Sequence, residues 1–211
     1  IHCGMNMTQE RIAIIGAGLM GHGIAQIFAS VGHEVAVFDP SRDALDKVHE
    51  SVRNILTILE EDPSKADHIT LHTEMANAVR EADIVIEAAP EKLALKQDLF
   101  KELDTICPPD VTLASNTSAL PITEVAATST HRSRIIGAHF WNPPHFVPLV
   151  EVIQTEQTDL THVHRMMRAL EAAGMSPVHV RKDIPGFIGN RLQHALKREA
   201  IALVADGVCD A

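Results

Sequence analysis

Several features are scarce in this sequence, and each absence narrows the class of protein. Cysteine occurs only at Cys3, Cys107 and Cys209, which lie far apart. An odd, widely spaced set indicates reduced thiols in a cytoplasmic compartment rather than a disulfide framework. No apolar run is long enough to span a bilayer and no signal peptide is visible. We therefore expect a cytoplasmic protein with no membrane partner.

Positive charge and metal-binding motifs are lacking as well. The chain has 18 Lys and Arg against 28 Asp and Glu, a formal net charge of −10. Binding to a polyanion needs clustered basic residues, so no nucleic-acid partner is expected, although a helix N-terminus can still hold a phosphate locally. The 13 histidines form neither an HExxH motif nor paired Cys/His spacing, so no metal site is expected.

The chain does contain a regular alternation of strand-like and helix-like segments. Its 211 residues, 45% hydrophobic, suffice for one full α/β domain and part of another. The predicted strands are Arg11–Ile15, Glu34–Phe38, Ile84–Glu87, Val111–Ala114, Ile135–His139, Val147–Ile153 and Pro177–Val180. The predicted helices are Met20–Val31, Arg42–Glu60, Leu93–Ile106, Leu160–Ala173 and Phe187–Ala205. Apolar strands alternating with helices indicate an α/β fold with a mostly parallel sheet covered on both faces.

The two ends of the chain differ from this pattern. Residues 1–4 read as a vector remnant or an upstream extension, with Met5 or Met7 as the native start. A linker, Asp183-Ile184-Pro185-Gly186, separates a first domain over residues 5–184 from a second over residues 185–211. The last helix carries one apolar stripe, formed by Ile188, Leu192, Ala195, Leu196 and Leu203. Such a stripe normally packs against partner helices, so we expect an all-α domain cut short, self-association and poor activity of this chain alone.

A glycine-rich turn follows the first strand and opens the first long helix, in the sequence Gly16-Ala17-Gly18-Leu19-Met20-Gly21. A GxGxxG pattern is weak by itself, but here a strand precedes it and a helix follows it. This context favours a Rossmann-type doubly wound sheet whose turn binds the pyrophosphate of a dinucleotide. Asp39, at the end of the second strand, can accept hydrogen bonds from the adenosine ribose and repel a 2′-phosphate. NAD is therefore the expected cofactor, although Arg42 could soften that repulsion.

The most specific segment is Gly137-Ala138-His139-Phe140-Trp141-Asn142-Pro143-Pro144, followed by Leu149-Val150-Glu151-Val152. His139 leaves a parallel strand at its carboxyl end, where open α/β sheets place their ligands. A dehydrogenase needs a base for the hydroxyl proton, and histidine titrates near neutral pH. Glu151, brought back by the Pro143-Pro144 turn, can hold one ring nitrogen of His139 and stabilise the imidazolium.

From Arg11 to its end, the chain resembles the L-3-hydroxyacyl-CoA dehydrogenase family. Five stretches carry the resemblance: GAGLMG, DIVIEAAPE, ASNTSAL, the His-Phe-x-Asn-Pro segment with LVEV, and PGFIGNR. The resemblance implies catalytic roles for His139, Glu151, Ser118 and Asn190. It implies NAD contacts from Gly16, Gly18, Leu19, Met20, Gly21, Asp39, Glu91, Lys96, Ser118 and Asn142. It also implies a small-molecule hydroxyacyl substrate, held as a CoA thioester, and a homodimer formed through the helical domain.

Two departures leave the substrate open. Trp141 stands where the family usually has Phe, and the segment NPPHFVPL is similar to relatives acting on free hydroxy acids, such as gulonate and carnitine dehydrogenases. In the segment Val48–Asp62, four of the charged side chains are carboxylates and only Arg53 is basic. Relatives that act on CoA thioesters carry basic residues in this segment. From the resemblance we expect NAD-dependent oxidation of an L-3-hydroxyacyl-CoA to the 3-oxoacyl-CoA, and the reverse reduction. Two alternatives stay open: a dehydrogenase of a free 3-hydroxy acid and a non-catalytic crystallin-like NAD-binding protein. On a purely structural interpretation, the stretch Asn116–Ser118 is a polar loop and Lys96 a solvated helix residue.

Overall fold

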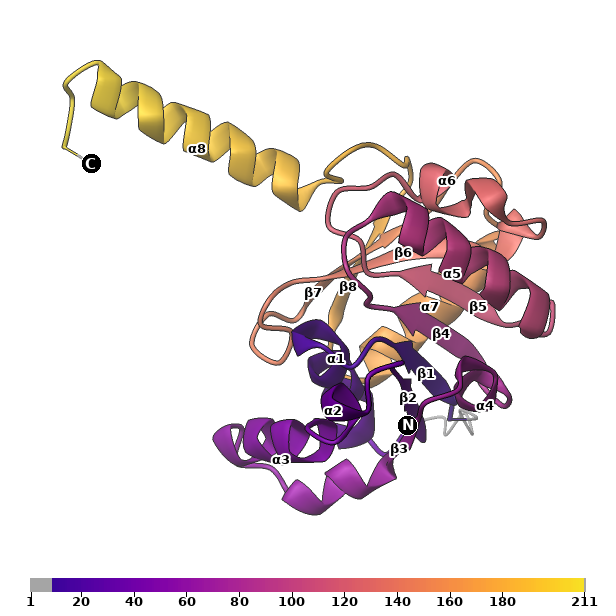
Figure 1. Ribbon diagram of the computed structural model, residues 1–211. Coiled ribbons are helices and arrows are strands. Elements are labelled where there is room, and N and C mark those ends of the chain that lie inside the picture. The colour runs from indigo at the N-terminus through magenta and orange to yellow at the C-terminus, as the bar shows by residue number, and fades with distance from the viewer. Residues whose placement is uncertain (1–8, 211) are drawn as a thin grey trace, which may run out of the picture.

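In the computed structural model, residues 9–210 are described, so the expectations about Cys3, Met5, Met7 and the leading residues lie outside the described part. The protein is built around one eight-stranded sheet (Figure 1) with the order β3-β2-β1-β4-β5-β6-β7-β8. The strands are β1 (Ile12–Ile15), β2 (Val35–Phe38), β3 (Ile69–His72), β4 (Ile84–Glu87), β5 (Thr112–Ser115), β6 (Ile135–Phe140), β7 (Leu149–Ile153) and β8 (Ser176–Val180). Neighbouring strands pair in parallel except β6 and β7, which pair antiparallel.

Helices cover both faces of this sheet. They are α1 (Leu19–Ser30), α2 (Arg42–Leu45), α3 (Val48–Ile58), α4 (Met75–Val79), α5 (Leu93–Ile106), α6 (Ile122–Val125), α7 (Leu160–Ala172) and α8 (Gly189–Ala205). Three short 3-10 helices, η1 (Pro63–His68), η2 (Ala126–Thr128) and η3 (Arg132–Arg134), complete the set. The predicted Rossmann-type doubly wound, mostly parallel α/β fold is confirmed.

The sheet separates two hydrophobic clusters because successive side chains of a strand point to opposite faces. Along β1, Ile12 and Ile14 pack in the cluster that includes α1, α3 and α7. Ala13 and Ile15 pack in the other, with α4, α5 and α6. All four are at most 1% exposed, and burying each large aliphatic side chain contributes roughly 1.5–3 kcal/mol. These two layers hold the carboxyl end of β1 in place.

Three local predictions were wrong. Strand β3 was missed because it is a four-residue edge strand in which only Ile69 is buried, so it has little apolar signal. The single helix expected over Arg42–Glu60 is interrupted between α2 and α3, where Asp46 and Lys47 have ψ angles of −20° and −14°. The last helix begins at Gly189 rather than Phe187, because Gly186 and Phe187 have left-handed φ angles of 73° and 48°.

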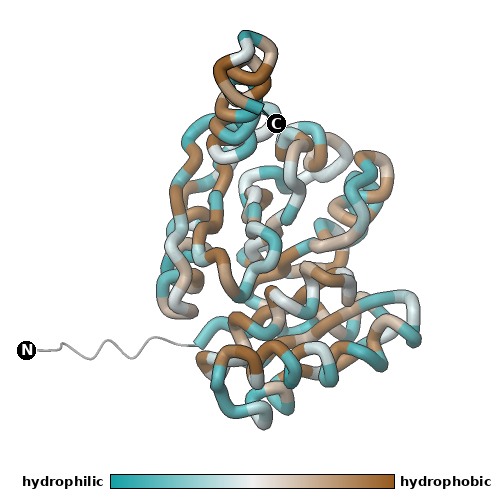
Figure 2. The backbone as a smooth tube through the Cα atoms, turned by 90° about the vertical axis from the view of Figure 1, so that its left-hand side faces the viewer, coloured by the Kyte–Doolittle hydropathy of each residue, from teal (hydrophilic) through white to brown (hydrophobic). Residues whose placement is uncertain are grey.

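Helix α8 extends away from the sheet (Figure 1), and none of its residues is buried. Figure 2 shows hydrophobic residues in brown along the protruding helix. Leu192 is 66% exposed and Leu196 is 72% exposed. The expected apolar stripe is therefore present and uncovered. Over residues 9–210, every helix is too short or too polar to cross a membrane.

Candidate active site

The sheet order reverses beside β1, which has β2 on one side and β4 on the other. Ligands of open α/β sheets bind in the crevice at such a reversal, beyond the carboxyl ends of the strands. The turn after β1 and the loops after β2, β4, β5 and β6 all lie at this edge. The residues that the sequence assigned to cofactor or substrate lie in these loops, at the ends of these strands or in the first turns of the helices that follow. Glu151 and Asn190 are the exceptions.

Each glycine of the turn after β1 has a distinct geometric reason. Gly16 has a φ of 112°, and a Cβ there would lie 2.8 Å from the Ala88 carbonyl oxygen. A Cβ on Gly21 would lie 1.8 Å from the Gly16 carbonyl oxygen, so the helix packs directly on the turn. Gly18, by contrast, has open space in front of it, and no side chain caps the N-terminus of α1. The turn thus presents free N–H groups and the positive end of a helix dipole to an anion, as a dinucleotide pyrophosphate requires.

Asp39 stands at the end of β2, next to this turn. Its two carboxylate oxygens accept hydrogen bonds from the N–H groups of Ala17 (2.9 Å) and Ser41 (2.8 Å). Each oxygen keeps a further lone pair, which suits a ribose hydroxyl. Leu19, 61% exposed, and the half-buried Met20 form the first turn of α1 beside it. The glycine turn and the acidic residue are thus held together, as the sequence predicted.

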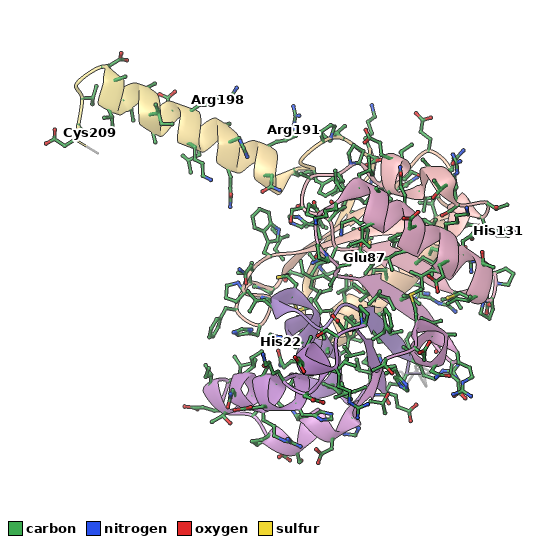
Figure 3. All side chains as sticks on the ribbon, viewed as in Figure 1. His22, Glu87, His131, Arg191, Arg198 and Cys209 are labelled. Carbon is green, nitrogen blue, oxygen red and sulfur yellow. The ribbon has the colours of Figure 1, made fainter. Side chains whose placement is uncertain are left out.

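A buried charge network lies beneath the loops after β4 and β5. The Lys96 ammonium contacts Glu87 Oε1 at 2.6 Å, and the side chains are 1% and 0% exposed. Glu87 also accepts the Ser115 hydroxyl (2.6 Å) and the Ala89 N–H (2.7 Å). Figure 3 shows Glu87 in the interior of the molecule. Lys96 is therefore no solvated helix residue, which corrects that interpretation of the sequence, and Glu87 is a member that sequence reasoning missed.

Glu91 joins this network to Ser118. Its Oε2 atom lies 3.4 Å from the Lys96 ammonium. Its Oε1 atom accepts the Thr117 hydroxyl (2.6 Å) and the N–H groups of Ser118 (3.0 Å) and Ala119 (3.3 Å). Burial raises the pKa of Glu91, but these hydrogen bonds and the Lys96 charge outweigh burial, so its pKa lies below the usual value. An ionised Glu91 thus fixes the loop that carries Ser118.

His139 and Glu151 face each other on the antiparallel strands β6 and β7, where they are register partners. His139 Nδ1 lies 2.8 Å from Glu151 Oε2, and both side chains are buried. Burial raises the pKa of Glu151. Hydrogen bonds from His139 and from the N–H groups of Gly189 and Ile188 lower it by more, so the pKa lies below its usual value. Because an ionised carboxylate only accepts, Nδ1 carries the proton and Nε2 is the free ring nitrogen. This is the geometry expected of a histidine base.

Residues at the start of α8, distant in sequence, also contact the site. Glu151 Oε1 accepts the N–H groups of Ile188 (2.8 Å) and Gly189 (3.0 Å). The Asn190 side chain donates to the Ser118 carbonyl oxygen at 2.7 Å. Asn142 follows β6 and is exposed. The structure therefore brings Asn190 next to Ser118 and links α8 to the His139–Glu151 pair.

Sequence reasoning gave no role to Phe187, although it quoted the stretch PGFIGNR that contains it. Phe187 is fully buried, and its ring centroid lies 5.8 Å from that of His139. Trp141, seen in the sequence only as a departure, lies 5.0 Å from His139 on the same measure. Glu87 had one available signal, since it is a carboxylate ending an apolar strand.

Comparison with known proteins identifies the family. The family model described as "3-hydroxyacyl-CoA dehydrogenase, NAD binding domain" matches residues 11–184. An L-carnitine dehydrogenase of Streptomyces coelicolor is 41% identical over 202 residues, which cover 94% of this chain and 64% of that protein. A 5-formyl-3-hydroxy-2-methylpyridine 4-carboxylate 5-dehydrogenase of Mesorhizobium japonicum is 36% identical, over 95% of this chain and 67% of that protein.

The chain is also similar to a solved structure of a dehydrogenase. The 3-hydroxybutyryl-CoA dehydrogenase of Escherichia coli K12 superposes with a TM-score of 0.89 at 32% identity, over 96% of this chain and 44% of that one. The chain thus spans less than two thirds of the S. coelicolor relative and less than half of the E. coli chain.

Proposed function

The chain belongs to the 3-hydroxyacyl-CoA dehydrogenase family, and from this membership we propose that it exchanges a hydride between NAD and the hydroxyl-bearing carbon of a 3-hydroxy substrate. One observation carries the proposal: His139 Nδ1 bonded to Glu151 at 2.8 Å, at the ligand-binding edge of an NAD-binding sheet. A buried His–carboxylate pair at that edge is the acid–base unit that such a reaction needs.

In the oxidation direction, Nε2 of His139 accepts the proton of the substrate hydroxyl. NAD, held by the turn after β1 and by Asp39, would supply the hydride acceptor, and loss of the proton and the hydride turns the alcohol into a ketone. The positive charge formed on His139 is stabilised by Glu151, and the proton is afterwards released to solvent. In the reverse direction His139 donates that proton to the ketone oxygen.

We assign the remaining residues by their place around this unit. Neutral donors near the reacting oxygen come from Ser118, Asn142 and Asn190, which suit an oxygen gaining negative charge. The pyrophosphate is held at the turn formed by Gly16, Gly18, Leu19, Met20 and Gly21, and the ribose by Asp39. The open space at Gly18 supports the fit of NAD. Glu91 and Lys96 would support the NAD site indirectly, since Glu91 binds the loop that carries Ser118 and Lys96 lies beside Glu91.

Among the substrates, we propose a free 3-hydroxy acid rather than a CoA thioester. The turn after α3 carries Glu60, Glu61 and Asp62. The basic residues nearby are already paired, Arg53 with Asp67 and Lys65 with Glu61, each at 2.8 Å. CoA phosphates at this edge would therefore meet a net negative charge, because Glu60 and Asp62 add to pairs that are already neutral. The two relatives described above that act on substrates named without CoA support the same choice.

A CoA thioester is the second candidate, since the family model and the E. coli structure carry that substrate in their descriptions. The experiment measures NADH oxidation with acetoacetyl-CoA and with a panel of free 3-oxo acids, and uses His139→Gln as the background. We expect turnover of at least one free acid that exceeds turnover of acetoacetyl-CoA. Preference for acetoacetyl-CoA would overturn the substrate assignment. NADH binding by the full-length protein without turnover of any substrate would favour a non-catalytic protein.

We also propose that the chain contains two domains, over residues 5–184 and 185–211. The family match ends at residue 184, and α8 has no buried residue. Both observations support a boundary at the linker.

A further inference from the structure

Three consecutive residues, Phe187, Ile188 and Gly189, lead into α8 and contact the His139–Glu151 pair. The Phe187 ring packs near the His139 ring, with centroids 5.8 Å apart. The next two N–H groups, of Ile188 and Gly189, both donate to Glu151 Oε1. One short segment therefore reaches both members of the acid–base pair.

The backbone of Phe187 makes this double contact possible. Its φ of 48° is left-handed, a conformation that non-glycine residues rarely adopt, and it follows Gly186 at 73°. Two left-handed residues followed by the right-handed Ile188 turn the chain sharply, so that successive N–H groups converge on one oxygen. Converging N–H groups of this kind form a concave anion site, which here is filled by the Glu151 carboxylate.

The side chain of Phe187 holds the other member of the pair. His139 has two aromatic neighbours, Trp141 with centroids 5.0 Å apart and Phe187 at 5.8 Å. Phe187 is fully buried, so its ring has no freedom to leave this place. Its backbone directs the N–H groups that hold Glu151, and its ring limits the movement of His139.

Gly189 fits the same arrangement. A Cβ at this position would lie 2.3 Å from Cζ2 of Trp141, so the indole lies directly against the backbone of the first helical turn. Both aromatic neighbours of His139 are thus set by residues 187–189.

We propose that Phe187 is a positioning residue, whose left-handed backbone holds Glu151 and whose ring holds His139 in the orientation needed for proton transfer. The inference deepens the proposed function and rests on it for the catalytic meaning of the pair. Its geometric content, that Phe187 orders the His139–Glu151 hydrogen bond, is tested without any substrate.

The test uses Phe187→Leu, which removes the ring but leaves an unbranched Cβ, and Phe187→Val, whose branched Cβ disfavours a left-handed backbone. The matched control is Phe100→Leu, because Phe100 is also fully buried and belongs to the same hydrophobic cluster. The readout is the NMR resonance of the His139 Nδ1 proton in the 211-residue chain, assigned by its loss in His139→Gln.

We expect this resonance to broaden or vanish in both Phe187 variants and to persist in Phe100→Leu, although all three lower the melting temperature. If Phe187→Val does not fold, Phe187→Leu decides. An unchanged resonance in Phe187→Leu, or an equal loss in Phe100→Leu, would show that Phe187 has only a structural role.

A kinetic measurement then connects the inference to the reaction. With a substrate found in the panel above, Phe187→Leu should lower kcat by about tenfold, since misplaced catalytic groups lose rate steeply, while the NADH dissociation constant stays within about twofold. A raised NADH dissociation constant with unchanged kcat would contradict positioning of the acid–base pair. If no substrate is turned over, the proposed function fails, and the resonance still decides whether Phe187 orders the pair.

Discussion

Asp39 connects two features of the cofactor site in a single side chain. It accepts the Ala17 N–H within the glycine turn, and its place at the end of β2 faces the expected ribose. We predict tighter binding of NADH than of NADPH, because the carboxylate repels a 2′-phosphate.

The variant Asp39→Ser should narrow that difference by removing the charge. Fluorescence titration with both cofactors measures it, and Arg42→Ala, a change at an exposed neighbour, serves as the control. Equal affinities of the unmutated chain for NADH and NADPH would refute the role of Asp39.

For His139, we predict that replacement by Gln lowers turnover by about 10²–10⁴-fold, the usual cost of losing a positioned acid–base group. NADH affinity should change little. Glu151→Gln should also be damaging, because the imidazolium then lacks its counter-charge and Ile188 and Gly189 lose an anionic acceptor.

Steady-state turnover and NADH titration of the same preparations check this prediction. Turnover of the full-length protein that survives either change within a factor of a few would show that the pair is not the acid–base unit.

At the scale of elements, the end of α5 is tied to the start of β6 through Asp104 and Arg134. The carboxylate lies 2.9 Å from the guanidinium and accepts the N–H groups of Thr130 (2.7 Å) and His131 (3.1 Å). Burial raises the pKa of Asp104, but Arg134 and these hydrogen bonds outweigh it, so its pKa lies below its usual value. A depressed folded-state pKa means that the group stabilises the fold above its unfolded pKa of about 3.9.

We therefore predict that this stabilisation is lost as pH falls below about 4 and through the folded-state pKa. Asp104→Asn should lower the free energy of unfolding at pH 7 and should flatten its decline in acid. Urea unfolding at several pH values measures both effects. An equally steep decline in the variant would mean that other carboxylates cause the acid sensitivity.

The boundaries of the elements were predicted unevenly. The strand before the glycine turn and the two strands joined through the Pro143-Pro144 turn follow from apolar runs and turn residues. Strand β3 has one buried residue and lies at the sheet edge, so its pairing with β2 had to come from tertiary contact. The left-handed Phe187 had no sequence signal, because only its surroundings impose that conformation.

At the scale of the whole molecule, helix α8 protrudes from the rest of the protein in Figures 1 and 2 and exposes its apolar face. Figure 3 shows Arg191 and Arg198 projecting from the same helix. We predict that the 211-residue chain self-associates through this helix, because exposed apolar patches usually mark an interface.

Sedimentation velocity is the measurement, with Leu192→Glu combined with Leu196→Glu as the test variant. Lys197→Glu is the matched control, since it shifts the net charge by the same two negative units while leaving the apolar face intact. We expect the double variant to be monomeric and the control to associate. A monomeric unmutated chain would contradict the prediction.

The sequence by itself determined the α/β fold, the NAD-binding turn, the acidic residue at the second strand and the pairing of His139 with Glu151. These features depend on local patterns: an apolar run, a glycine spacing, and a turn that returns one strand beside another. Such patterns lie within a few residues of the side chains that they position.

Only the tertiary structure decided that Lys96 contacts Glu87, that Glu91 binds the loop carrying Ser118, and that residues 187–189 lie against the His139–Glu151 pair. Glu151 and Ile188 are 37 residues apart, and Asn190 and Ser118 are 72 apart. No local periodicity encodes contacts over such separations. They form because the packed sheet brings the loops to one edge, where buried polar groups must find partners.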